Sequence, residues 1–394
     1  MVLKYCQNVL LKNGKFYIAA IYGLTTIFYL QKFGIVSDLE ASKYINEAKL
    51  LIKNGSFSAS RYWFYSITIF IIAIALKLKI GLTGAFVLQA LLNLFSYLIF
   101  YKALKKIFKL PLIAFFIVLY LLVFWPYQSW VVFLFTESAF FSLILILASL
   151  MIIYKPNNLK NISIVCLGLV PLLLARPLGI IFLVSIYFYF FYCANRKWKI
   201  ILGAGSAAII FFGLFAVNTI FSTITDWTIT KAFEQESIIC NLPTTTLSGV
   251  KLNLSLNGGP AYQLFYYITH NFFHFLHFAG LKLQYFFLMT RPYYSNAHNN
   301  FLLINLIPLY LLAGAGFFIK KMQPDKAITV FSLTTIILYA ITIVIQCDDF
   351  HNRFILSIYP FFVILCAETI EYFILYFFKN YKHASSIGIK KTVS

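Results

Sequence analysis

Eleven long apolar stretches follow one another along this chain of 394 residues. A helix needs about 20 mostly apolar residues to cross the hydrocarbon core of a bilayer, so this succession constrains the fold more than any other feature. Apolar residues make up 61% of the chain and charged residues only 11%. This composition excludes a soluble globular enzyme, a disordered chain and a fibrous protein. The candidate spans are 16–33, 62–79, 81–101, 110–126, 133–154, 162–176, 178–195, 199–221, 300–319, 327–346 and 354–378.

The net charge of +20 is a signal of membrane topology. The lysines and arginines lie in short clusters between the apolar stretches, and such clusters are retained on the cytoplasmic side of a membrane. The pattern does not favour nucleic acid as a partner, because the basic residues do not form one continuous surface. Membrane lipids are the expected surroundings.

The segment 62–79 decides on which side every later loop lies. If it crosses the membrane, all the later basic clusters face outward. If it stays in the outer interface or re-enters, 19 of the 32 basic residues face the cytoplasm, which the positive-inside rule prefers. The stretch 262–290 then begins and ends outside. The cytoplasmic residues are Lys4, Lys12, Lys15, Lys102, Lys105, Lys106, Lys109, Lys155, Lys160, Arg196, Lys197, Lys199, Lys320, Lys321, Lys326, Lys379, Lys382, Lys390 and Lys391.

We therefore expect an all-α, polytopic membrane protein with about ten transmembrane helices and both termini in the cytoplasm. Interfacial or re-entrant helices complete its outer face. Residues 1–394 are expected to form a single integral membrane domain, with outer loops at 34–80 and 222–299. The expected location is the plasma (inner) membrane, with the active site facing the periplasm or exterior.

Nine of the twelve acidic residues fall on the predicted outer face, so chemistry that needs carboxylates belongs there. Glycine-rich phosphate-binding motifs are missing from the sequence. We expect no cofactor. The adjacent Asp348 and Asp349 could hold a divalent ion, but two neighbouring acids are a weak signal. The outer acids are Asp38, Glu40, Glu47, Glu137, Asp226, Glu234, Glu236, Asp348 and Asp349.

The first outer loop contains a predicted helix that lies on the membrane surface. Ser37 and Glu40 have the spacing of a capping box, and Gly55 follows as a left-handed C-cap. Tyr44, Ile45, Ala48, Leu51 and Ile52 share one face of this helix, and Lys43, Glu47 and Lys53 share the other.

Two acids of this loop are candidate catalytic bases. Glu40 is expected to be occupied in capping, which leaves Asp38 to point away from the helix. The structural alternative for Asp38 is a favourable charge at a helix N-terminus, worth about 0.3–1 kcal/mol. Glu137 lies where the second outer loop becomes a helix and has the same two interpretations, a first-turn acid or a polar anchor for substrate.

Three arginines lie at predicted outer helix ends, and each could clamp a phosphate through its guanidinium fork. They are Arg176, Arg291 and Arg353. The alternative is contact with lipid headgroups. Arg353 has the strongest case, because the acidic pair and His351 precede it.

Other polar residues carry weaker signals. Cys240 and Cys347 both lie outside, so a disulfide between them is a hypothesis. Glu368 is deep in the last span and could relay protons, whereas Glu371 is expected near Lys379 or Lys382. Within 262–290, three histidines recur at helical spacing: His270, His274 and His277. They could form a metal site, or they could be amphipathic side chains at the level of the lipid headgroups.

Four stretches in combination resemble the GT-C class of polytopic glycosyltransferases, which use lipid-phosphate sugars. The first is the acidic loop with its helix, SDLEASKYINEAKLLIKNG, and the second is a span ending in a basic cluster, LQALLNLFSYLIFYKALKKIF. The third is an aromatic-proline loop followed by FTES. The fourth is ARPLG together with the late NRFILSIYPFF. Within the class the chain resembles the mannosyl- and aminoarabinosyltransferase type.

The resemblance implies transfer of a hexose or pentose from a polyprenyl-phosphate donor to a hydroxyl of a lipid or glycan acceptor, with inversion. It implies a first-loop base, which matches Asp38. Glu40 is the alternative, because it lies four residues before Tyr44. The second-loop acid matches Glu137, and the phosphate-binding arginine matches Arg353.

Two other functions remain open at the level of sequence. A polymerase or ligase acting on polyprenyl-linked glycans would depend on outer arginines and histidines more than on Asp38. A flippase or transporter of lipid-linked glycans would depend on Glu368, and such proteins commonly contain internal repeats.

Overall fold

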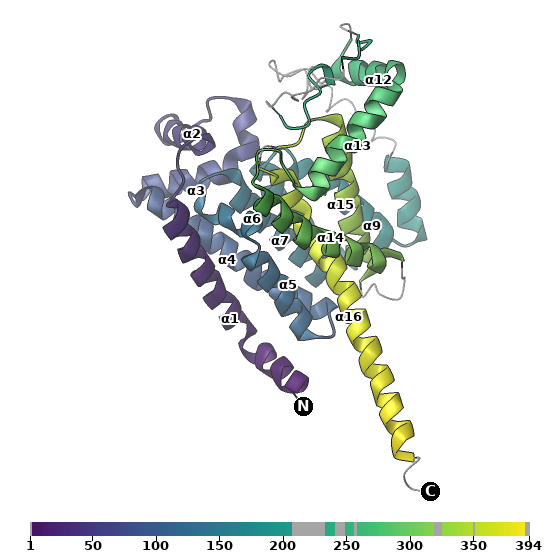
Figure 1. Ribbon diagram of the computed structural model, residues 1–394. Helices are drawn as coiled ribbons and strands as arrows, with labels where there is room; N and C mark the ends of the chain where they lie inside the picture. Colours follow the sequence, from purple (N-terminus) through teal and green to yellow (C-terminus); the bar gives the residue numbers. More distant parts are fainter. Residues whose placement is uncertain are drawn as a thin grey trace. The chain divides into compact units, whose positions relative to one another are not determined.

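The computed structural model describes residues 2–206, 233–240, 249–255, 258–318, 325–349 and 351–390, with side chains from 12 to 377 within these ranges (Figure 1). This part of the chain is all-α, with two isolated β-bridges. The elements are α1 Val2–Phe33, α2 Glu40–Asn54, η1 Ser60–Tyr65, α3 Ser66–Lys77, α4 Gly81–Ile107, α5 Pro111–Val123, α6 Trp125–Gln128, η2 Ser129–Val132, α7 Thr136–Ile153, α8 Leu159–Ala175, α9 Gly179–Cys193, α12 Pro260–His270, α13 Phe272–Leu288, α14 Asn296–Phe318, α15 Lys326–Ile345 and α16 Arg353–Lys390.

Several of these helices can cross a membrane, so the chain is a helical membrane protein. Five described helices are long and apolar enough, within α4, α7, α14, α15 and α16. A sixth crossing is added if α5 and the bent segment Trp125–Val132 form one span. The apolar helices α8 and α9 are shorter, at 17 and 15 residues.

One predicted span differs from the structure, and the segment 62–79 contains a helix shorter than a span. The stretch 110–126 is not one straight helix: α5 ends at Val123, and the chain bends by 68° before the segment that starts at Trp125. Pro126 is the second residue of this new helix, in the first turn, where its missing N–H costs nothing. Within 62–79, α3 has 12 residues and is about 18 Å long, short of the roughly 30 Å hydrocarbon core. The predicted span 199–221 lies outside the described residues from 207 onward, as do Asp226, Lys320 and Lys321.

The chain divides into two compact units. Unit 1 consists of Met1–Val184, Leu309–Thr329 and Tyr359–Ser394. Unit 2 consists of Ser185–Pro308 and Val330–Ile358. Four of the described helices, α9, α14, α15 and α16, contribute residues to both units.

The core of unit 1 forms where α4 packs against α7. One face of α4 carries Gln89, Asn93 and Tyr97, spaced four residues apart. The Asn93 amide donates to Ser142 Oγ on α7 (2.9 Å), and the Tyr97 hydroxyl donates to Gln128 Oε1 (2.7 Å). Because lipid offers no partners, buried polar groups in a membrane must bind one another. This network holds the bent segment after α5 against α4.

The loop between α1 and α3 contains the predicted helix, α2. Gly55 has φ 74° and donates its N–H to Leu51 O, which confirms the left-handed C-cap. The prediction that Glu47 lies on the solvent face is wrong. Glu47 is 3% exposed and accepts hydrogen bonds from the backbone N–H and the hydroxyl of Ser58. The carboxylate therefore fastens α2 to the loop that follows it, and Ile52, predicted to be on the apolar face, is exposed instead.

Backbone pairing joins the segment after α1 to the segment before α7. Val36 N–H donates to Val132 O, and Leu134 N–H donates back to Val36 O, both at 3.0 Å. Four residues after Val36 comes Glu40, and three residues after Leu134 comes Glu137. This single bridge thus sets the two predicted site acids near each other.

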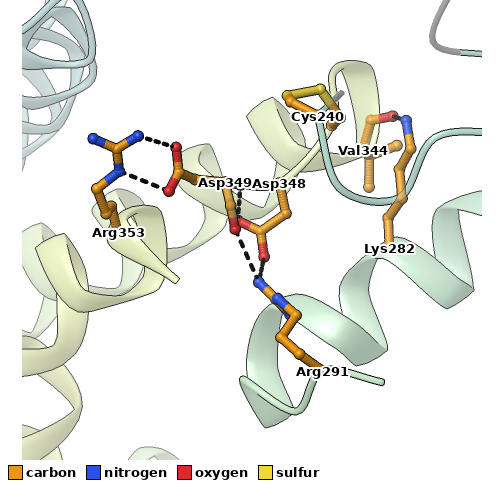
Figure 2. Close-up of a disulfide and its surroundings, with 8 residues drawn as sticks. Cys240, Lys282, Arg291, Val344, Asp348, Asp349 and Arg353 are labelled. Atoms are coloured by element: carbon orange, nitrogen blue, oxygen red, sulfur yellow. Dashed lines mark hydrogen bonds and ion pairs between the residues drawn. A yellow bond between two sulfur atoms is a disulfide. The ribbon is translucent and has the colours of Figure 1, made fainter. Parts of the chain in front are cut away.

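Unit 2 contains the predicted disulfide. Cys240 and Cys347 are bonded across a sequence separation of 107 residues, which confirms the hypothesis from the sequence (Figure 2). Two hydrogen bonds flank it, from Cys240 N–H to Asp348 O and from Asp348 N–H to Ile238 O. The segment after α15 is thereby held at a fixed position for Asp348 and Asp349.

We expect the disulfide to be detectable in protein purified without reductant. Blocking free thiols and then reducing should release two additional thiols, which mass spectrometry should map to peptides containing Cys240 and Cys347. Cys166 and Cys193, which are free and exposed, should be labelled before reduction and serve as the internal control. Labelling of Cys240 or Cys347 before reduction would contradict the assignment.

Candidate functional site

The first candidate site lies at the start of α2. The helix begins at Glu40, its N-cap residue is Leu39 with φ 50°, and no side chain caps it. The predicted capping box is therefore wrong, because Ser37 lies too far before the first turn. Glu40 instead accepts a hydrogen bond from the hydroxyl of Tyr44, one turn later, at 2.5 Å. Lys43 Nζ lies 3.9 Å from the same carboxylate oxygen.

Asp38 occupies a different environment. It lies before the helix and is exposed, and its backbone carbonyl accepts the N–H of Ala41. The side chain makes none of the ion pairs found among the described residues. Of the two acids left open by the sequence, Glu40 is the one that other functional groups surround.

Glu137 and Arg176 form a buried ion pair. Glu137 lies in the first turn of α7 and is 0% exposed, and Arg176 directly follows α8. Arg176 Nη1 lies 2.5 Å from Glu137 Oε1, and its guanidinium also faces the ring of Phe140. Arg176 is therefore held by protein groups, and the interpretation as a simple lipid-contacting arginine does not describe its surroundings.

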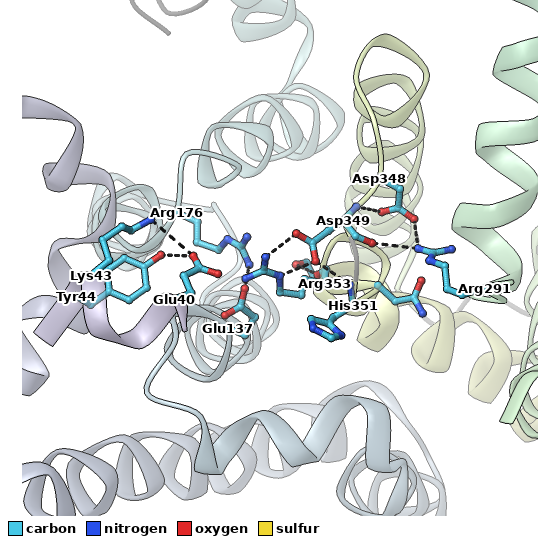
Figure 3. A network of polar contacts seen from close by, with 12 residues as sticks. Glu40, Lys43, Tyr44, Glu137, Arg176, Arg291, Asp348, Asp349, His351 and Arg353 are labelled. Atoms are coloured by element: carbon cyan, nitrogen blue, oxygen red, sulfur yellow. Dashed lines mark hydrogen bonds and ion pairs between the residues drawn. The ribbon is translucent and has the colours of Figure 1, made fainter. Parts of the chain in front are cut away.

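Six residues form one electrostatic unit, which we call the first-loop cluster: Glu40, Lys43, Tyr44, Tyr65, Glu137 and Arg176. Figure 3 shows five of them, all except Tyr65. The rings of Tyr44 and Tyr65 are 5.6 Å apart, and Lys43 Nζ lies within 5.1 Å of both ring centres. Burial raises the pKa of the Tyr44 hydroxyl, and the Glu40 carboxylate raises it further. The charges of Glu137 and Arg176 act on both tyrosines as well.

The cluster can orient a carboxylate next to polar groups of a substrate. Tyr44 keeps its proton, so it remains a hydrogen-bond donor to Glu40 and fixes the rotamer of that carboxylate. Nearby cations are also present, because Lys43 and Arg61 face the rings of Tyr65 and Tyr62. The sequence carried one signal for Tyr44, its spacing of four residues from Glu40. The contribution of Tyr65 is visible only in the structure.

The second candidate site, in unit 2, pairs two arginines with the two adjacent acids (Figures 2 and 3). Arg291 is 1% exposed and binds Asp348 and the backbone carbonyls of Tyr285 and Thr290. Burial raises the pKa of Asp348 to about 6, although Arg291 lowers it. Arg291 thus has a structural role, because its donors are directed into the fold.

Arg353 is the first residue of α16 and forms a bidentate ion pair with Asp349. Its Nε and Nη2 lie 2.6 and 2.7 Å from the two carboxylate oxygens, the bidentate geometry typical of arginine and carboxylate. His351 is exposed and donates its backbone N–H to the same carboxylate. The two acids, which the sequence marked as only a weak signal for a divalent ion, both bind arginines here, and the described residues contain no group of three or more ligands suited to a metal.

The remaining predicted residues make contacts that the sequence did not indicate. His274 lies between the Tyr267 hydroxyl (2.7 Å) and Glu236 (3.0 Å), whereas His270 stacks on Tyr266. Glu371 accepts the backbone N–H of Leu110 before α5. The side chains of Lys379 and Lys382, its expected partners, lie outside the described residues. Glu368 is buried near Thr329 in unit 1.

Lys282, which sequence reasoning missed, is fully buried on α13 (Figure 2). Its Nζ donates to Val344 O at 3.3 Å and lies about 4.5 Å from the rings of Phe233 and Phe278. Burial lowers its pKa from 10.5 to about 7. The aromatic faces compensate part of the cost of placing a cation there.

Comparison of this chain with protein families, characterised proteins and solved structures finds no match. The function must therefore be argued from the residues and their geometry.

We predict that the Glu137–Arg176 pair shows strong thermodynamic coupling. Arg176→Met alone should destabilise the protein by about 3–5 kcal/mol, because it leaves a buried carboxylate without its cation. Adding Glu137→Leu should recover much of that loss. Thermal unfolding of the two single variants and the double variant in detergent measures the coupling, and additive losses would contradict it.

Lys282 should make stability depend on pH. Its pKa in the fold lies below the unfolded value, so between about pH 7 and 10.5 the unfolded chain binds more protons and stability rises with pH by roughly 1.4 kcal/mol per unit. Lys282→Met should remove this slope in unfolding measured from pH 7 to 9.5. Lys251→Met, at an exposed lysine, should keep it. An unchanged slope in Lys282→Met would reject the assignment.

Proposed function

We propose that this chain is a membrane glycosyltransferase that moves a sugar from a polyprenyl-phosphate donor to an acceptor hydroxyl. The observation that carries the proposal is the first-loop cluster, in which an oriented carboxylate lies among tyrosines and cations. General-base catalysis needs such a carboxylate within reach of the acceptor hydroxyl. The resemblance to the GT-C class, with its acidic first loop, adds support.

In the proposed reaction Glu40 is the base, in place of Asp38. Glu40 has a defined rotamer through Tyr44 and lies within the cluster, whereas Asp38 is exposed to solvent. Glu40 takes the proton of the acceptor hydroxyl, and the resulting oxygen attacks the anomeric carbon. The bond from that carbon to the phosphate oxygen breaks on the opposite face, so the configuration inverts and polyprenyl phosphate leaves. Glu137 positions Arg176 and does not take part in proton transfer.

Phosphate binding is assigned to Arg353, as the resemblance implies. Asp349 holds its guanidinium in a fixed plane at the first turn of α16, where the helix dipole also favours an anion. A fixed cation stabilises the charge that develops on a leaving phosphate. Arg291 and Arg176 have lower priority, because buried carboxylates of the fold engage them.

The proposal includes the membrane topology derived from the basic clusters: about ten crossings, both termini in the cytoplasm and the first outer loop facing the exterior. The shortness of α3 supports it, because a helix of this length is suited to the interface or to a re-entrant hairpin. The donor and the acceptor would then both be reached from the outer leaflet.

The decisive experiment is lipid mass spectrometry on cells that lack the protein. We expect an accumulated polyprenyl-phosphate sugar and an acceptor that lacks one sugar. Re-expression of the native chain should reverse both changes, whereas Glu40→Gln should lower transfer by about 10²–10⁴-fold because the base is lost.

Asp38→Asn is the matched control, since it removes a carboxylate two residues away, and it should restore transfer. If Asp38→Asn abolishes sugar transfer and Glu40→Gln keeps it, then Asp38 is the base and the assignment to Glu40 is wrong. Glu368→Gln should also restore transfer. If only Glu368→Gln fails, the protein is a transporter and the proposed chemistry is wrong.

A further inference from the structure

A cavity of about 370 Å³ opens in unit 1 at the end of α7 that is remote from Glu137. Its walls come from the last turns of α4 and α7, the loop before α8, the first turn of α8 and the residue before α15. Ile152 follows Glu137 by 15 residues on α7, so the cavity lies about 22 Å along the helix from the first-loop cluster. It is therefore a separate site.

Apolar and polar side chains both line the cavity. The apolar ones, which we call the floor, are Ile107, Ile152 and Ile153, at the ends of two helices long enough to cross a membrane. The polar ones, which we call the rim, are Lys106, Lys155, Asn157, Asn161 and Asp325. This change from apolar to polar coincides with the ends of the spans, so the cavity lies at the level of lipid headgroups.

The negative charge of Asp325, the one acid of the rim, is already balanced by neighbouring groups. Asp325 Oδ1 accepts the backbone N–H groups of Ala327 and Ile328, and Oδ2 lies 3.2 Å from Lys155 Nζ. Lys106 is exposed and makes no ion pair within the described part of the chain. The rim therefore keeps a net positive charge. The N-terminal ends of α8 and α15 add to the field that attracts an anion.

The rim is also rigid enough to form a site. Asn161 donates its side-chain amide to Lys155 O (2.7 Å), and Asn158 caps α8 by accepting the backbone N–H of Asn161 (2.9 Å). The loop that carries Lys155 and Asn157 is thus fixed against α8.

We propose that this cavity binds the phosphate headgroup of an anionic phospholipid, with the glycerol and first acyl carbons on the isoleucine floor. Basic pockets between helix ends at a membrane surface have the chemistry for such headgroups. A small inorganic anion would need neither the apolar floor nor a cavity of this volume, whereas a phospholipid headgroup with its first acyl carbons would use both. The inference does not depend on the proposed sugar transfer.

The test uses the full chain purified in a neutral detergent. Phosphatidylglycerol should raise the unfolding temperature and remain bound in native mass spectrometry, whereas phosphatidylcholine and glycerol phosphate at the same concentration should do neither. The double variant Lys106→Gln, Lys155→Gln should weaken retention of phosphatidylglycerol by about tenfold or more, because both lysines that attract the anionic headgroup are lost.

A matched pair outside the cavity, Lys102→Gln with Lys160→Gln, removes the same charge and should retain the lipid. Asn157→Asp leaves both lysines in place and should weaken binding by adding a carboxylate to the rim. Equal loss in the matched pair would overturn the site. Equal protection by glycerol phosphate would overturn the lipid as its ligand, and equal protection by phosphatidylcholine would overturn recognition of the charge.

Discussion

The buried ion pair between Glu137 and Arg176 is the interaction on which the first-loop cluster of unit 1 depends. It joins the first turn of α7 to the residue that follows α8, and its charges act on Tyr44 and Tyr65, which lie between α1 and α3. Removing two charges from water is expensive, and only close contact compensates for it. The pair thus holds the start of α7 and the end of α8 in one arrangement. The backbone bridge at Val36 places Glu40 near this ion pair.

The same principle organises unit 2 with different residues. Asp348 and Asp349 are adjacent in sequence, yet each holds a different arginine, one buried just after α13 and the other at the start of α16. The disulfide and its two flanking hydrogen bonds fix the backbone on which both acids lie. An acidic pair that could suggest a metal site is therefore an anchor for two guanidinium groups, and one of these is the candidate for phosphate binding.

The sequence was informative where local physics decides structure. The helix α2 and its glycine C-cap were predictable, because helical periodicity and the positive φ of Gly55 depend only on neighbouring residues. The capping box was not, since Leu39 takes a positive φ and the helix begins at Glu40. Glu47 has the spacing of a surface residue on the helix. Its carboxylate is nevertheless buried, because it accepts two hydrogen bonds from Ser58, eleven positions later. The bend after α5 likewise has its partners on α4, which no local pattern reveals.

Composition and the basic clusters by themselves determined that this chain is a helical membrane protein, because the energetic cost of polar groups in lipid permits few alternatives. They also identified the acids and arginines from which a site can be built. Which of them act together was decided by tertiary structure alone. Glu40 and Asp38 are almost equivalent in sequence, but only Glu40 has Tyr44 as a hydrogen-bond donor and lies in the first-loop cluster. Side chains that pair with one another are often far apart in the sequence, and only the packed fold brings them into contact.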